Sequence, residues 1–123
     1  MRFAIALLFC ASTVGFAGSW TGQLVDSRCW TSRETNVSAD GPLVNHNLNS
    51  DIRHCAPTDD TKKFAVVTND WHRFKLDGTG NARAYQLAQH ANWHAPCVTV
   101  TGVLHKKTIN VSSIAPAQVK KTR

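Results

Sequence analysis

Alternation of apolar and polar residues predicts the first three strands of this chain. In the stretch SWTGQLVDS, even-numbered positions from Trp20 to Leu24 alternate with odd-numbered ones until Asp26 ends the pattern. A period of two residues is typical of a half-buried strand. In the runs KKFAVVT and HRFKLD, which residues 69–71 separate, apolar residues two positions apart share one face, such as Phe64 with Val66 and Phe74 with Leu76. These two runs therefore predict a hairpin.

The stretch CVTVTGVLHKKTINVSSI predicts a second hairpin with a short basic link. Its first run keeps apolar residues and glycine on one face from Val98 to Leu104. In the return run, Ile109 and Val111 are spaced to pack on the same face, but Ile114 falls out of phase with them. We therefore expect a β-bulge at residues 112–113.

One short helix is predicted between the two hairpins. Small and apolar residues recur at helical spacing from Ala84 to Ala91, with Thr79 or Asn81 as the N-cap and Pro96 as the stop. In contrast, residues 30–61 are rich in Asn, Ser, Asp and Thr and show no periodicity. Such a segment is commonly functional or partly disordered, so we expect a long polar loop inserted after the first strand.

The predicted order is strand, long loop, strand, strand, helix, strand, strand. Five strands with one helix between the third and fourth match the OB-fold, a small and partly open barrel. We therefore predict a mainly β protein with an OB-like domain over residues 18–115 and a basic tail over 116–123. The competing architecture is a small open sheet with the helix packed on one face.

The first residues, MRFAIALLFCASTVGFAGSW, have the three-part pattern of a secretory signal peptide. A cation precedes an apolar run, and small residues favour cleavage after Ala17, so residues 1–17 are assigned to the signal. The apolar run is shorter than the ~20 residues that a membrane span needs, so no transmembrane anchor is expected. We expect an exported protein, periplasmic or extracellular.

The full chain has 14 Lys and Arg against 8 Asp and Glu, for a net charge of +6. Its basic residues lie in scattered pairs, a weaker pattern than the clustered stripe of a dedicated nucleic-acid binder. Once the signal is removed, the chain keeps Cys29, Cys55 and Cys97, which allow three disulfide pairings. Cys29 with Cys55 is the first choice because it would tie down the polar segment, and Cys29 with Cys97 is the alternative.

Several of these stretches together resemble a group of small exported bacterial proteins of unknown function. The shared features are a Trp-x-Gly strand ending in Asp-Ser-x-Cys (WTGQLVDSRC), a later cysteine with a Lys-Phe strand (HCAPTDDTKKFAVVT), and a closing Val-x-Val-Thr-Gly-x-Leu hairpin (VTVTGVLHKKTINVSSI). The resemblance covers most of residues 19–115 and implies an OB-type barrel and export. It implies no activity.

OB-folds bind single-stranded nucleic acids or oligosaccharides on strands two and three and on the flanking loops. Aromatic side chains and cations are what such ligands require. The candidates near the strands are Trp71, Arg73 and Lys75. The candidates in the loops are Arg28, Trp30, Arg33 and Arg53 in the first and Lys106 and Lys107 in the last. Alternatively, Trp71 covers a turn and the cations are solvated.

Metal binding and catalysis are the other two kinds of chemistry to consider. His90, His94 and Cys97 have ligand-like spacing for zinc or copper if the helix continues past His90. No catalytic motif is present, so we expect neither an enzyme nor a cofactor. The sequence therefore predicts a monomeric binding module for an unknown partner, such as an anionic polymer, a glycan or an envelope component. A metal-handling protein or a purely structural envelope protein is the alternative.

Overall fold

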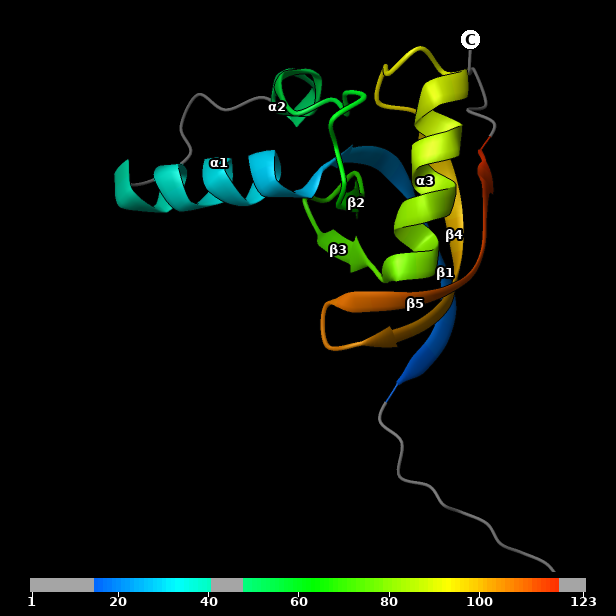
Figure 1. Cartoon of the computed structure of the whole chain (residues 1–123). Coiled ribbons are helices and arrows are strands. Elements are labelled where there is room, and N and C mark those ends of the chain that lie inside the picture. Colours follow the sequence, from blue (N-terminus) through cyan, green and yellow to red (C-terminus); the bar gives the residue numbers. More distant parts are fainter. Residues whose placement is uncertain (1–14, 41–47, 118–123) are drawn as a thin grey trace, which may run out of the picture.

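Five strands form a closed barrel in the order β1-β2-β3-β5-β4, as predicted for an OB-like domain (Figure 1). The computed structural model describes residues 15–40 and 48–117. The predicted signal peptide up to residue 14, and the tail from residue 118, lie outside these ranges. The strands are β1 (Phe16–Asp26), β2 (Phe64–Val67), β3 (Arg73–Leu76), β4 (Cys97–His105) and β5 (Thr108–Pro116).

The long strand β1 contributes to both sides of the barrel. Its first part, from Phe16 to Gln23, pairs with β4, and its end, from Gln23 to Asp26, pairs with β2. Gly22 lies where the strand changes partner, and a Cβ there would lie 2.3 Å from the carbonyl oxygen of Val67. Only glycine permits this close approach of two backbones.

A short parallel pairing closes the barrel between β3 and β5. It consists of the pairs Lys75–Thr108 and Leu76–Ile109. By contrast, β4 and β5 pair along their whole length in antiparallel fashion. The register skips Ser112, because Thr101 pairs with Ser113 and Gly102 with Val111. This irregularity confirms the expected bulge, and β5 runs to Pro116, so the strand enters the predicted tail by one residue.

The barrel interior holds the main hydrophobic core. The alternating residues of the strands and one face of the helix α3 (Gly78–His90) meet there, as their sequence patterns predict. The fully or nearly fully buried members are Leu24, Phe64, Val66, Leu76, Ala84, Ala88, Val98, Val100, Ile109 and Val111. The hairpin of β2 and β3 is confirmed by the pairs from Ala65–Lys75 to Val67–Arg73.

The N-cap of α3 differs from the prediction. Asp77, rather than Thr79 or Asn81, accepts a hydrogen bond from the backbone N–H of Gly80 at 2.9 Å. Asn81 instead accepts one from the N–H of Phe64 at the start of β2. The first turn of the helix, residues 78–81, is polar and rich in glycine. The apolar residues therefore indicate a later start than the structure has.

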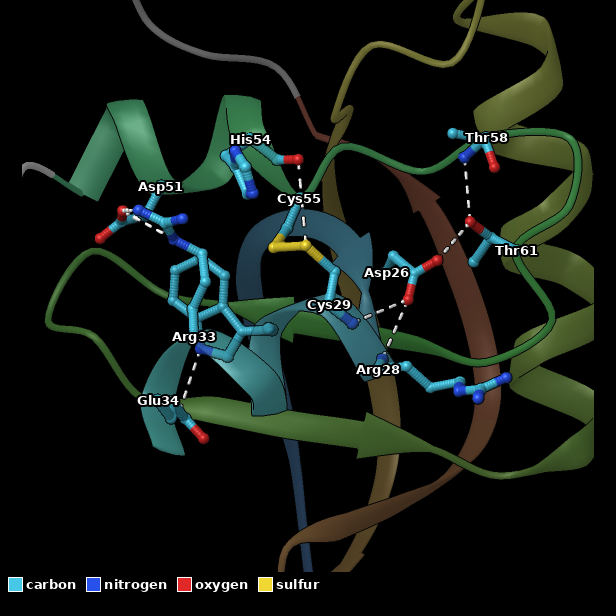
Figure 2. Close-up of a disulfide and its surroundings, with 11 residues drawn as sticks. Asp26, Arg28, Cys29, Arg33, Glu34, Asp51, His54, Cys55, Thr58 and Thr61 are labelled. Carbon is cyan, nitrogen blue, oxygen red and sulfur yellow. Dashed lines mark hydrogen bonds and ion pairs between the residues drawn. A yellow bond between two sulfur atoms is a disulfide. The ribbon is translucent and has the colours of Figure 1, made fainter. Parts of the chain in front are cut away.

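The expected long loop is wrong as a description of residues 30–61. The chain forms α1 (Ser27–Asp40) directly after β1 and α2 (Leu48–His54) before β2. Asp26 caps α1, because its Oδ1 accepts hydrogen bonds from the N–H groups of Arg28 and Cys29 (Figure 2). A few separated apolar residues are enough to hold both helices on the barrel. Lacking a continuous apolar face, neither helix has a periodic sequence signal.

The disulfide between Cys29 and Cys55 is present, as the first choice of pairing predicted (Figure 2). It connects the first turn of α1 to the residue after α2. Cys97 is a free, half-buried thiol. The inserted segment is thus covalently closed at the point where it leaves and rejoins the barrel.

Candidate ligand-binding surface

The two inserted helices cover the outer face of β2, where OB-folds usually bind. Ala65 and Val67 point out of the barrel and are buried beneath Trp30 of α1 and Ile52 of α2. Trp30 is only 2% exposed, so it cannot serve as an open stacking surface. The predicted role of Trp30 in ligand contact is therefore wrong, because its indole is part of a second core.

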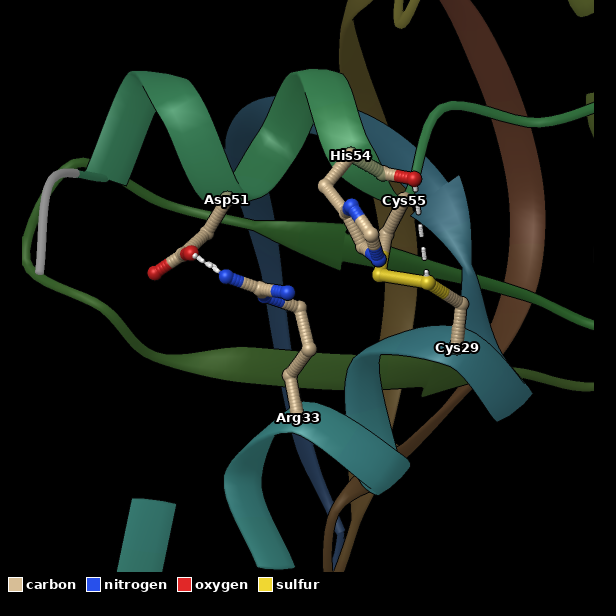
Figure 3. Close-up of polar contacts among 5 residues, drawn as sticks. All are labelled: Cys29, Arg33, Asp51, His54 and Cys55. Carbon is tan, nitrogen blue, oxygen red and sulfur yellow. Dashed lines mark hydrogen bonds and ion pairs between the residues drawn. A yellow bond between two sulfur atoms is a disulfide. The ribbon is translucent and has the colours of Figure 1, made fainter. Parts of the chain in front are cut away.

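Polar contacts reinforce this cover on both sides. Arg33 of α1 donates hydrogen bonds to Asp51 of α2, one of them from Nε at 3.0 Å (Figure 3). Glu34 accepts a hydrogen bond from the indole N–H of Trp30 at 3.0 Å and one from Nη2 of Arg73 at 3.0 Å. The helix α1 is therefore fixed to α2, to its own buried tryptophan and to β3.

A basic groove opens beside this cover. It has a volume of about 870 Å³ and lies where α1, β2, β3, α3 and β5 come together. We define it by its three exposed cations, Arg28, Lys63 and Lys75. None of its described lining residues is acidic. The others are Ser27, Thr31, Ser32, Phe64, Leu76, Gly78, Asn81 and Thr108.

A smaller aromatic cleft lies next to the groove. Its volume is about 260 Å³, and its lining residues are Glu34, Trp71, His72, Arg73, Phe74 and Lys107. The two sites are linked by a backbone hydrogen bond. The N–H of Lys75, which lines the groove, donates to the carbonyl oxygen of Lys107, which lines the cleft, at 2.8 Å. Groove and cleft thus form adjoining parts of one surface.

The turn that carries Trp71 is fixed by several hydrogen bonds. Thr68 accepts at its carbonyl from the N–H of Trp71 and donates its own N–H to His72. Its hydroxyl also donates to the carboxylate of Asp70, which lowers the pKa of Asp70, with a smaller contribution from His72. Because this pKa is lowered in the folded protein, the contribution to stability is present at neutral pH and is lost as the pH falls through the lowered value.

The structure brings some of the predicted candidates together and separates others. Trp71, Arg73 and Lys107 share the cleft, and Lys75 lines the groove. Lys106 is exposed at the tip of the closing hairpin with a φ of 61°. Arg53 lies in a different hollow beside His94, so the structure does not place it in either site.

The proposed metal ligands are not assembled. The helix α3 ends at His90, so His94 lies in the following turn and does not share a helical face with it. Over residues 15–40 and 48–117, no three His, Cys, Asp or Glu side chains are grouped so that they could hold a metal ion. His90, His94 and Cys97 therefore offer no ready site there.

Sequence reasoning did not single out Lys63 or Glu34 as site residues. Lys63 immediately precedes β2, and its position at a strand end is the only signal that could have placed it beside the groove. Glu34 lies in a segment that was expected to be a loop. Its contact with Arg73 depends on α1 being helical, so no local pattern could have indicated it.

Comparison with protein-family models, curated proteins and solved structures finds no match. Within the part of the chain that is described, no helix combines the length and the apolar character needed to cross a membrane. Function is therefore inferred from the geometry of the groove and the cleft.

Proposed function

We propose that this protein is an exported, non-catalytic binding module that holds an anionic polymer in the basic groove. The observation that carries the proposal is the grouping of Arg28, Lys63 and Lys75 around one hollow with no acidic residue in its described lining. These cations come from α1, the start of β2 and β3. They are far apart in the sequence, and the barrel brings them together.

The chemistry of the groove favours a polymer with regularly spaced negative charges. Exposed Lys and Arg side chains attract such a ligand at long range and release its counterions on binding. Thr31, Ser32 and Thr108 also line the groove, and their hydroxyl groups can donate hydrogen bonds to carboxylate, sulfate or phosphate oxygens. The open shape of the surface suits an extended chain that continues beyond the protein.

Two features support export. The disulfide Cys29–Cys55 fits an oxidising compartment. Cleavage after Ala17 would remove only Phe16 and Ala17 from β1, and both are exposed; Phe16 is 73% exposed. The core residues of β1 would remain in the mature chain, so the predicted cleavage is compatible with the barrel.

The proposal is tested by fluorescence anisotropy with two labelled probes, a linear polyuronate and a single-stranded DNA oligonucleotide, over a series of salt concentrations. The double variant Lys63→Gln, Lys75→Gln should bind at least about fivefold more weakly than the wild type. For the DNA probe, losing two phosphate contacts should reduce the slope of log K against log salt by about 1.4.

The matched control is the double variant Lys62→Gln, Arg53→Gln, which removes the same charge outside the groove. It should keep most of the affinity and most of the salt slope. Equal losses in the two double variants would mean that net charge alone drives binding. If neither probe bound the wild type at low salt, the proposed function would be wrong.

A further inference from the structure

We propose that the aromatic cleft is a subsite for a single acidic sugar ring, which makes a carboxylated glycan the polymer that this protein binds. This inference rests on the proposed function, because the cleft would hold one unit of the chain that crosses the basic groove. The inference adds the chemical class of the ligand and the residues that recognise it.

Trp71 provides the platform for the ring. Its indole is 38% exposed although it is a large apolar group, and its backbone has a φ of 71°. A non-glycine residue rarely adopts this left-handed conformation, which costs free energy unless the surroundings impose it. The turn from Thr68 to His72 imposes it here. The indole is also packed on the buried Trp30, with ring centroids 6.2 Å apart.

The polar groups around Trp71 match the substituents of an acidic sugar. Arg73 and Lys107 are the cations that a ring carboxylate would meet. Glu34 is 40% exposed at its side chain and uses one lone pair on each oxygen for Arg73 and Trp30. A carboxylate has about four acceptor sites, so Glu34 can still accept hydrogen bonds from sugar hydroxyls.

Arg73 is held in the cleft at a cost to stability. Its side chain is 16% exposed, and Nη2 donates to Glu34, but its Nε is buried without a hydrogen-bond partner in the described part of the chain. Leaving a buried donor unpaired is unfavourable, and such groups in native structures call for an explanation. Because this Nε is buried, a ligand in the cleft could contact the guanidinium only through its Nη groups, and Nη2 already donates to Glu34.

Glu34 also favours a sugar over a nucleotide. This carboxylate repels the anionic group of either ligand, which would have to lie toward Lys107, but a sugar ring also carries several hydroxyl donors that Glu34 can accept from. The weakly positive C–H groups on one face of a pyranose ring suit the negative face of an indole. A volume of about 260 Å³ is below the range of sites for drug-sized ligands and fits one ring.

The position of the cleft matches a polymer rather than a free sugar. Lys75 lines the groove and Lys107 lines the cleft, and their backbones are hydrogen-bonded. One ring stacked on Trp71 would therefore direct the neighbouring units of its chain toward Lys63 and Arg28. Charge along the groove and a single stacking position would together select a glycan with regular carboxylates.

The test uses four probes: a short oligouronate, the neutral oligosaccharide of the same length, single-stranded DNA and inorganic polyphosphate. The variant Trp71→Ala should weaken oligouronate binding about tenfold, by analogy with the loss of one aromatic stacking contact to a base. It should leave the salt slope unchanged, because no charge is removed. Trp71→Phe should restore part of the affinity. Arg73→Gln should also weaken binding, but it breaks the ion pair with Glu34, so its thermal unfolding midpoint is measured as well. Lys107→Gln leaves that ion pair intact and should weaken binding too.

The outcomes separate this inference from the proposed function. If the double variant Lys63→Gln, Lys75→Gln weakens oligouronate binding and Trp71→Ala does not, the stacking subsite is wrong, while binding in the basic groove is still supported. If Trp71→Ala weakens binding to DNA but not to the oligouronate, the assignment to a sugar is wrong. Equal affinity for the neutral and acidic oligosaccharides would also overturn the acidic class. A loss of thermal stability in Trp71→Ala but not in Trp71→Phe, with equal affinities, would assign Trp71 a structural role only.

Discussion

At the scale of single residues, Asp77 shows how one carboxylate joins two elements. Its Oδ1 accepts from the N–H of Gly80 at the start of α3 and from the N–H of Val111 in β5, at 2.9 and 3.2 Å. The first contact satisfies a free donor of the helix, and the second satisfies a donor beside the β-bulge. Asp77 therefore fixes α3 against the strand that closes the barrel.

Replacing Asp77 with Ala should lower the free energy of unfolding by about 2 kcal/mol, because an N-cap is lost and a second N–H loses its acceptor. Chemical denaturation monitored by circular dichroism measures this change. Asp77→Asn keeps an acceptor and should cost clearly less. The control Thr79→Ala, at an exposed position that the sequence offered as a cap, should change stability by no more than about 0.5 kcal/mol. A loss in Thr79→Ala as large as in Asp77→Ala would contradict this assignment.

The same residue explains a limit of sequence reasoning. Thr79, Asn81 and Asp77 all have side chains that can cap a helix, and the sequence does not say which N–H each will meet. Likewise, Trp30 and Trp71 both lie in stretches with charged and polar neighbours, yet one is buried and the other exposed. Burial depends on what α2 and β2 place over each ring, which is a tertiary contact.

At the scale of elements, the strands were predictable and the two inserted helices were not. In β2, Phe64 and Val66 face the barrel while Ala65 and Val67 face the helices, so the strand is buried on both sides. A short continuous apolar run with β-branched residues, such as FAVV, is typical of such a strand. The helix α1 is held by Asp26, by Trp30 and by a disulfide. None of these creates a periodic pattern.

The disulfide should determine whether α1 and α2 stay on the barrel. The double variant Cys29→Ser, Cys55→Ser should lose about 3–4 kcal/mol of unfolding free energy, as expected for a crosslink that spans 26 residues. Hydrogen exchange should increase most in α1 and α2 and least in β4. The control Cys97→Ser removes a thiol that forms no disulfide and should leave exchange in α1 and α2 unchanged. Uniform loss of protection over the whole barrel would show that the insertion is not a separable unit.

At the scale of the whole molecule, the candidate surface depends on five elements that are distant in the sequence. The sequence indicated Trp71, Arg73 and Lys75 because they lie on or next to one strand. It also predicted Lys107 in a loop that flanks this face, but the contact itself requires the parallel pairing of β3 with β5, which no local pattern indicates. It also could not exclude Arg53, which the fold directs to another hollow.

The predicted signal peptide leads to an expectation for the intact protein. When the full chain is expressed in a bacterial host, the exported product should have the mass of residues 18–123 with one disulfide formed. Its unfolding should remain cooperative, because the residues removed from β1 are exposed. Mass spectrometry of the cell fractions measures both the start of the chain and the number of free thiols. An uncleaved product confined to the cytoplasm would argue against export.

The short parallel pairing between β3 and β5 has a further consequence. Two residue pairs close the barrel there, with hydrogen bonds from Lys75 to Lys107 and from Asp77 to Ile109. This junction forms part of the wall of the basic groove, where Lys75 and Thr108 face each other. A glycan lying across it would hold the two strands together from outside. Opening of the barrel and release of the ligand would then be linked, so a bound polymer would stabilise the strand pairing that has the fewest residue pairs in the barrel.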